Sequence, residues 1–278
     1  MKRSSDGLNM SSKNLCEIAR EILLTSDPDL KASRTINTVE DWTSRRIPEI
    51  GVCKVPDKPA EPLGVQLVDP WKVPKRGKGG TEATRISSLH SLCHIEQVAV
   101  NLAWDIVARF ADQDLPRAFY DEWVRVAGEE AKHYKILSER LQELDSKYGS
   151  LPAHNRLWES ATETADSLEA RLAIVHMVHE ARGLDIHPKT VDRFRSSGDL
   201  RSVSLLEDVI YPDEITHVQA GVRWFKHLYK DSSEEEVICR FHEIVRERFR
   251  GNLKEPFNHE ARAKAGFTKN WYEPLSKD

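Results

Sequence analysis

The sequence has few cysteines and lacks any long apolar run. Its 278 residues include four cysteines, Cys16, Cys53, Cys93 and Cys239, and no two form a Cys-x-x-Cys pair. This spacing argues against a zinc ribbon, a rubredoxin-type module or a disulfide framework, so we expect reduced thiols. The apolar runs are too short to span a bilayer, and the segment MKRSSDGLNM lacks the apolar core of a secretion signal. We therefore expect a cytoplasmic protein with no membrane partner.

The charge balance excludes a strongly basic protein. Lysine and arginine number 41 against 45 aspartate and glutamate, for a net charge of −4, so binding to nucleic acid would need a local patch. One candidate for phosphate contact is the basic stretch that contains Lys72, Lys75 and Arg76. Arg182 is a second candidate for substrate contact. The alternative for each is a solvated side chain or an internal salt bridge.

Composition divides the chain into three zones. The expected zones are residues 1–80, 81–231 and 232–278. In the first zone, two short helices precede a strap whose density of prolines forbids long helices. Apolar residues among these prolines, including Val52, Leu63 and Trp71, predict a strap that is anchored on a core. The last zone is expected to form a helix and an irregular tail that packs back on the middle zone.

The middle zone has the pattern of a helical bundle. Its apolar residues recur at intervals of three and four, which indicates four amphipathic helices. Lengths of about 28 residues are typical of a long four-helix bundle. Each apolar stripe contains ionisable residues where a hydrophobic residue is expected. These are Glu96 on the first helix, Glu130 and His133 on the second, Glu180 on the third, and Glu214 and His217 on the fourth.

The spacing of these residues is duplicated. One Glu-x-x-His motif begins at Glu130 and a second begins at Glu214, and a glutamate lies 34 residues upstream of each, at Glu96 and Glu180. A single Glu-x-x-His motif is expected by chance in a chain of this composition. The same upstream offset in both sets is much rarer, so the paired spacing carries the hypothesis of a common site.

The pattern has a direct chemical interpretation. Residues at i and i+3 place a carboxylate and an imidazole on one helix face, where a glutamate of a neighbouring helix can meet them. The doubled unit supplies four carboxylates and two imidazoles, and burying these without a counter-charge is unfavourable, so two divalent cations are expected. Such ligands suit iron or manganese. The alternative is that all six side chains lie on solvated helix faces.

Segments around these residues resemble a known superfamily. The segments are His94-Ile-Glu96, Glu129-Glu130-Ala-Lys-His133, Glu180-Ala-Arg-Gly-Leu-Asp185 and Asp213-Glu214-Ile-Thr-His217. The chain from about residue 82 to 230 resembles the ferritin-like diiron-carboxylate superfamily. It is most similar to a ferritin-like domain-of-unknown-function family related to the MiaE-type tRNA hydroxylases.

The resemblance implies a fold and a site. The fold would be all-α, a ferritin-like four-helix bundle with N-terminal helices, a proline-rich strap, and a C-terminal helix plus tail. The six stripe residues would be catalytic ligands of two iron ions, with manganese as the other candidate metal. Behind them, Asp213 would hydrogen-bond His133, and Glu129 would hydrogen-bond His217.

The resemblance also implies a function. It predicts a non-haem diiron oxidoreductase, a monooxygenase or hydroxylase, that uses dioxygen as co-substrate and takes electrons from an external reductase. The implied substrate is a modified, prenylated tRNA nucleoside, which would make the reaction a tRNA modification. The alternatives are a ferroxidase or peroxidase that handles iron or peroxide, and a non-catalytic metal-stabilised scaffold. The oligomeric state is not predicted.

Overall fold

All regular elements in the described part of the chain are helices, which confirms the expected all-α class. The computed structural model describes residues 13–73 and 80–276. Lys75 and Arg76, from the predicted basic stretch, lie outside these ranges. Across the described ranges, no helix is both long enough and apolar enough to cross a membrane.

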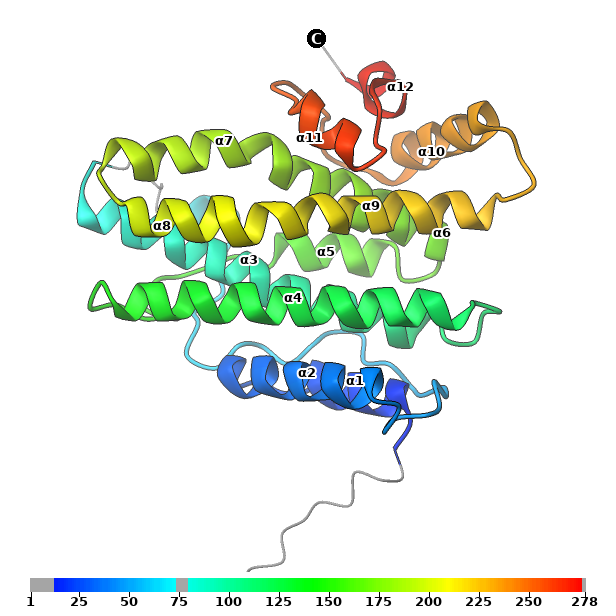
Figure 1. The fold of residues 1–278 in the computed structure, drawn as a ribbon, viewed down its shortest axis with the longest axis horizontal. Helices are drawn as coiled ribbons and strands as arrows, with labels where there is room; N and C mark the ends of the chain where they lie inside the picture. Colours follow the sequence, from blue (N-terminus) through cyan, green and yellow to red (C-terminus); the bar gives the residue numbers. More distant parts are fainter. Residues whose placement is uncertain (1–12, 74–79, 277–278) are drawn as a thin grey trace, which may run out of the picture.

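Two pairs of long helical rods form the centre of the molecule (Figure 1). The first pair is α3 (Glu82–Arg109) and α4 (Arg117–Gln142). In the second pair, each rod is made of three consecutive helical segments. One rod consists of α6 (Leu168–Arg171), η3 (Leu172–His179) and α7 (Glu180–Ser196), and the other of α8 (Leu200–Ser204), η4 (Leu205–Ile210) and α9 (Tyr211–Leu228). α3 packs along α4, while η3 and α7 pack along α9. α3 has 28 residues, the length that the apolar pattern predicted.

The second pair of rods contains two π-helical segments, η3 and η4. At the end of η3, the N–H of Glu180 donates to the carbonyl of Val175, and at the end of η4, that of Tyr211 donates to Leu206. Both are hydrogen bonds across five residues, the π-helical spacing, which is frequent at functional sites. The segments end directly before Glu180 and four residues before Glu214. The two predicted ligands of this pair therefore follow local widenings of their helices.

Glycine allows the second pair to pack closely. A Cβ atom on Gly221 of α9 would lie 2.3 Å from the carbonyl oxygen of His176 in η3. Only a residue without a side chain permits this approach of the two backbones. Gly221 therefore sets the distance between η3 and α9 next to the predicted ligand-bearing turns.

Shorter helices cover the bundle on two sides (Figure 1). α1 (Leu15–Leu23) and α2 (Pro28–Thr43) pack on α3 and α4, and the opposite side carries α10 (Glu234–Arg248), α11 (His259–Lys264), α12 (Lys269–Tyr272) and η5 (Glu273–Leu275). The connection from α4 to α6 contains α5 (Arg156–Glu163), which contacts α3 and η3. The apolar pattern did not predict α5, which is only eight residues long.

The strap differs from the expectation in how it is held. Val52, Leu63 and Trp71, three of its predicted anchors, are 64 %, 68 % and 79 % exposed. Val55, another apolar residue of the strap, does pack against the core, and backbone hydrogen bonds hold the strap at further points. The amide of Ala60 donates to the carbonyl of Leu23, that of Leu63 to Ser26, and that of Val68 to Ala153. The strap ends in the short helix η2 (Pro70–Lys72).

The C-terminal segment is more regular than the expected tail. It folds into α11, α12 and η5, and buries Phe267, Trp271 and Tyr272. Arg262 lies 2.6 Å from the carboxylate of Asp185 on α7. Its guanidinium also lies over the rings of Phe267 and Tyr272. A buried ion pair and cation–π contacts therefore join this segment to the bundle.

Candidate metal centre

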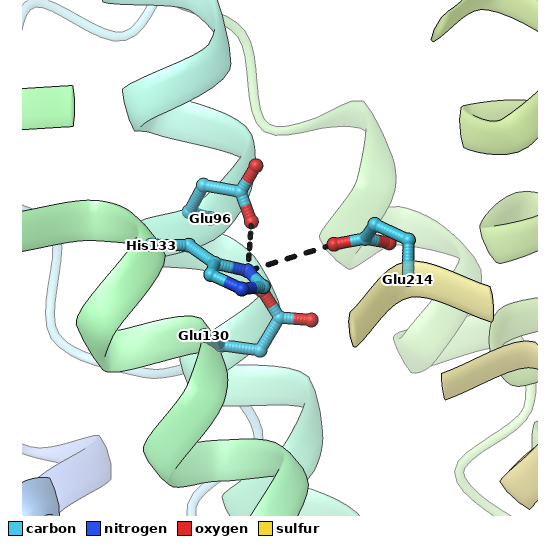
Figure 2. Close-up of side chains that lie close together, drawn as sticks. All are labelled: Glu96, Glu130, His133 and Glu214. Carbon is cyan, nitrogen blue, oxygen red and sulfur yellow. Dashed lines mark ion pairs between the residues drawn. The ribbon is translucent and has the colours of Figure 1, made fainter. Parts of the chain in front are cut away.

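Four ionisable side chains meet between α3, α4 and α9 in the middle of the bundle (Figure 2). Glu96 comes from α3, Glu130 and His133 come from α4, and Glu214 comes from α9. One oxygen or nitrogen atom from each lies within 4.8 Å of the others. Glu96, Glu130 and His133 are buried. The structure thus brings four of the six predicted ligands into one group that could hold a metal ion.

The other two predicted ligands adjoin this group. His217 Nδ1 lies 3.0 Å from Glu130 Oε1 and 3.8 Å from Glu214 Oε1. Glu180 interacts with Glu214 and lines the same cavity as Glu96. All six side chains therefore face one region of the bundle interior. Their role as metal ligands stays a prediction.

The Nε2 atom of each histidine is hydrogen-bonded to an acid of the opposite Glu-x-x-His segment. The distance from His133 Nε2 to Asp213 Oδ2 is 3.0 Å, and that from His217 Nε2 to Glu129 Oε2 is 2.9 Å. These are the two hydrogen bonds that the resemblance implied. Because a carboxylate accepts from Nε2–H, the lone pair of the neutral ring lies on Nδ1, which faces the other carboxylates.

Three buried atoms at the centre have no hydrogen-bond partner. They are Glu130 Oε2, His133 Nδ1 and His217 Nδ1. Glu130 Oε2 and His133 Nδ1 are 3.5 Å apart. Buried polar atoms are normally paired, and leaving them unpaired is unfavourable. One carboxylate oxygen and two imidazole nitrogens are a donor set that a cation completes, so these residues fit an ion such as iron or manganese.

The pKa values reflect the crowding of acids without a cation. Burial, together with the charge of Glu130, raises the pKa of Glu96 to about 8 and that of Glu180 to about 7. Burial acts to lower the pKa of the two histidines, but the surrounding carboxylates raise it by more. The hydrogen bond to Asp213 and the nearby carboxylates of Glu130 and Glu96 raise the pKa of His133 well above its usual value, and the charge of Glu130 does the same for His217. Protons therefore occupy this site in the metal-free protein.

We expect metal binding at this site to weaken as the pH falls. Glu96 and Glu180 hold protons below pH values of about 8 and 7 respectively, and a metal ion must displace them. Affinity for Mn²⁺ should therefore decrease by about tenfold per pH unit for each displaced proton as the pH is lowered through this range. Calorimetric titration in buffers of different ionisation enthalpy measures both the affinity and the protons released. A pH-independent affinity would contradict the assignment.

An apolar cavity of about 110 Å³ lies against the acids. Glu96, Glu180 and Glu214 form part of its wall. A volume of this size holds several water molecules or a small organic group. The rest of the wall is largely apolar and includes Leu92 and Ile95 from α3, Leu157 from α5, and Leu206 and Ile210 from η4 and its end. The sequence did not reveal this cavity because it depends on α5 and on the π-helical turn.

The remaining candidate substrate residues lie apart from the acids. Lys72 pairs with Asp69 at 2.8 Å and lines a different hollow. Arg182 lies on α7, lines a groove beside the cavity, and donates to the carbonyl of Lys254 at 3.1 Å. No described contact joins Lys72 to the predicted ligands. His94, near the site in sequence, bonds the hydroxyl of Tyr148 at 2.7 Å.

The fold and the site define a class: an all-helical bundle protein with a buried group of carboxylates and histidines that could bind metal. The family model described as "Protein of unknown function (DUF455)" matches residues 24–273. The chain belongs to this family. It is also 36 % identical over 262 residues to an uncharacterised protein from Haemophilus influenzae, across 89 % of this chain and 88 % of that protein. No solved structure matches the chain.

Proposed function

We propose that this protein is a non-haem diiron oxygenase or hydroxylase. The observation that carries the proposal is the pair of histidines whose Nε2 atoms are held by acids while both Nδ1 atoms are unpaired beside carboxylates. Glu96, Glu130, His133, Glu180, Glu214 and His217 would hold the two ions. When bound, iron supplies the activation of dioxygen for attack on an organic substrate.

The surrounding residues support such chemistry in three ways. Asp213 and Glu129 fix the orientation of the two imidazole rings. The largely apolar cavity wall would give an organic group an apolar surface to pack on beside the acids. Once a metal ion has displaced their protons, the carboxylates of Glu96 and Glu180 would supply negative charge that balances the two cations.

The substrate, the electron donor and the choice of metal are finer parts of the proposal. The resemblance of the sequence supports a modified, prenylated tRNA nucleoside as the substrate and an external reductase as the electron donor. The oxygen and imidazole donors support iron and also suit manganese. A ferroxidase and a metal-stabilised scaffold are the other outcomes that the following test can return.

We expect the purified, metal-stripped protein to bind about two ferrous ions per chain without oxygen. It should then consume dioxygen in amounts comparable to the bound iron and change its visible absorption. Metal analysis, an oxygen electrode and stopped-flow spectroscopy measure these results. Oxidation of many irons per chain would indicate a ferroxidase. Substoichiometric iron with no oxygen uptake would contradict the oxygenase and favour manganese or a scaffold.

A further inference from the structure

A wide groove of about 510 Å³ lies next to the cavity at the candidate metal centre. The two hollows share five wall residues, which are Ile95, Leu157, His179, Gly183 and Ile186. The groove also reaches the segment that follows α10, including Phe249. Because the walls are shared, the groove directly adjoins the cavity that the acids line.

Gly183 lies at the junction of the two hollows. A Cβ atom built on this residue has no other atom within 4 Å, so the space beside it is open. Gly183 lies inside α7, where glycine is a poor helix former and any other residue except proline would favour the helix. Neither helix formation nor packing explains a glycine here. A need to keep the space between the groove and the cavity open would explain it, since a side chain would project into that space.

The groove has an excess of positive charge that the protein does not fully neutralise. Four arginines and two glutamates line it. They are Arg156, Arg182, Arg248, Arg250, Glu159 and Glu163. Arg248 is paired with Asp166 at 2.9 Å, and Arg250 is paired with Glu163 at 3.1 Å. These two arginines are therefore already occupied.

The other two arginines are available to a ligand. Within the described ranges, the exposed guanidinium of Arg156 has no ion pair or hydrogen bond. Arg182 donates through Nη1 to the carbonyls of Lys254 and Pro256, and Nη1 also lies 3.5 Å from Asp185, a carboxylate that Arg262 holds more closely, at 2.6 Å. Its Nη2 and Nε atoms take part in none of the described contacts. Pairs of guanidinium groups are suited to phosphate or carboxylate groups, which they bind through several charge-assisted hydrogen bonds.

We propose that the substrate of the candidate metal centre is an organic anion that enters through this groove. Its phosphate or carboxylate group binds Arg156 and Arg182, and its apolar end passes Gly183 into the cavity beside Glu96 and Glu214. The inference rests on the proposed function for the role of the metal. Recognition of the anion is independent of the metal and is tested separately.

The first test measures binding of simple amphiphiles to the metal-free and the metal-loaded protein. Hexyl phosphate, hexanoate and hexan-1-ol share an apolar chain and differ in charge. In calorimetric titration we expect at least one anion to bind about tenfold or more tightly than the alcohol, because of the charge-assisted bonds. The stronger of the two anions identifies the group that the groove prefers. Equal affinity for the alcohol and both anions would overturn the proposal.

Matched variants locate the anion. Arg156→Gln should weaken anion binding about tenfold and leave hexan-1-ol binding unchanged. Arg246→Gln on α10 removes the same charge from an exposed side chain outside the groove wall and should change neither affinity. The same effect from both variants would show that only the overall charge matters, which would overturn the role of Arg156. Because Arg156 is exposed and unpaired, its replacement should not disturb folding.

The second test follows the apolar end. Hexyl phosphate with a terminal trifluoromethyl group is added to protein loaded with Mn²⁺, and the fluorine NMR line should broaden because the label lies near the paramagnetic ion. In Gly183→Leu the broadening should decrease several-fold while Mn²⁺ content is unchanged. Gly183→Ala is the matched control, with a smaller side chain in the same passage, and should retain more broadening. Unchanged broadening in Gly183→Leu would exclude this route.

The two tests separate the inference from the function on which it rests. If Mn²⁺ and iron do not bind, the proposed metal centre fails, while anion binding to the metal-free protein still tests Arg156 and Arg182. If metal binds but the anions do not, the metal centre stands and the groove assignment fails.

Discussion

Glu130→Gln should lower the metal content of the protein to half or less and reduce oxygen consumption by about a hundredfold or more. Glu130 lies between the two histidines, with Oε1 3.0 Å from His217 Nδ1 and Oε2 3.5 Å from His133 Nδ1. Although burial opposes ionisation, the charges of the neighbouring His217 and His133 hold the pKa of Glu130 below its usual value. The substitution keeps the shape but removes a charge and a donor oxygen that both halves of the site share.

Glu139→Gln is the matched control for this variant. Glu139 is on the same helix, is exposed, and lies more than two turns beyond Glu130. Its replacement removes the same charge and should leave metal content and oxygen uptake unchanged. Metal analysis and an oxygen electrode compare both variants with the parent protein. Full metal content in Glu130→Gln would show that the site is assigned to the wrong residues.

The duplicated spacing predicted the central cluster because it depends only on helix geometry. Residues at i and i+3 share a helix face, so Glu130 with His133 and Glu214 with His217 meet whenever their helices are neighbours. The long apolar stripes fixed which faces are buried. The upstream acids Glu96 and Glu180 lie on those stripes, and the structure directs both to the same interior region.

Other features depend on tertiary packing and could not be predicted from these patterns. The apolar pattern does not show where a helix widens into a π-helical turn, as at η3 and η4, and it does not show the close approach of Gly221 to His176 in η3. Of the apolar strap residues that looked like anchors, Val52 and Leu63 are exposed, whereas Val55 packs against the core and backbone hydrogen bonds also hold the strap. Apolar composition alone does not determine which side of an irregular segment is covered.

The hydrogen bonds from the two histidines to Asp213 and Glu129 were predicted, but only through the resemblance to a known family and not from helix geometry. Asp213 and Glu129 each precede the glutamate of a Glu-x-x-His motif, and only the resemblance suggested that each would cross to the other motif. The structure contains both contacts. A longer side chain at Glu129 than at Asp213 gives distances that differ by 0.1 Å, so the two halves reach the same arrangement with different residues.

A buried ion pair between α6, at the start of the rod that contains η3, and α3 should contribute strongly to stability. Arg171 and Asp105 are both fully buried and form an ion pair between α6 and α3. Arg171 also donates to Thr164 at 2.9 Å and to the carbonyl of Ala161 at 2.6 Å, so it joins α5 to the bundle. Arg171→Met leaves the Asp105 carboxylate with Arg109 alone. We expect the free energy of unfolding to fall by about 3–5 kcal/mol in denaturant titration.

An exposed ion pair provides the comparison for Arg171→Met. Arg195 is paired with Glu207 at 2.7 Å, and both side chains are more than 40 % exposed. Arg195→Met should therefore lower the free energy of unfolding by less than about 1 kcal/mol. Because Arg171 directly precedes η3, its loss should also loosen the segment that delivers Glu180, and metal content measured below the unfolding transition should decrease. Similar decreases in the free energy of unfolding in Arg171→Met and Arg195→Met would show that the buried ion pair stabilises the fold no more than an exposed one.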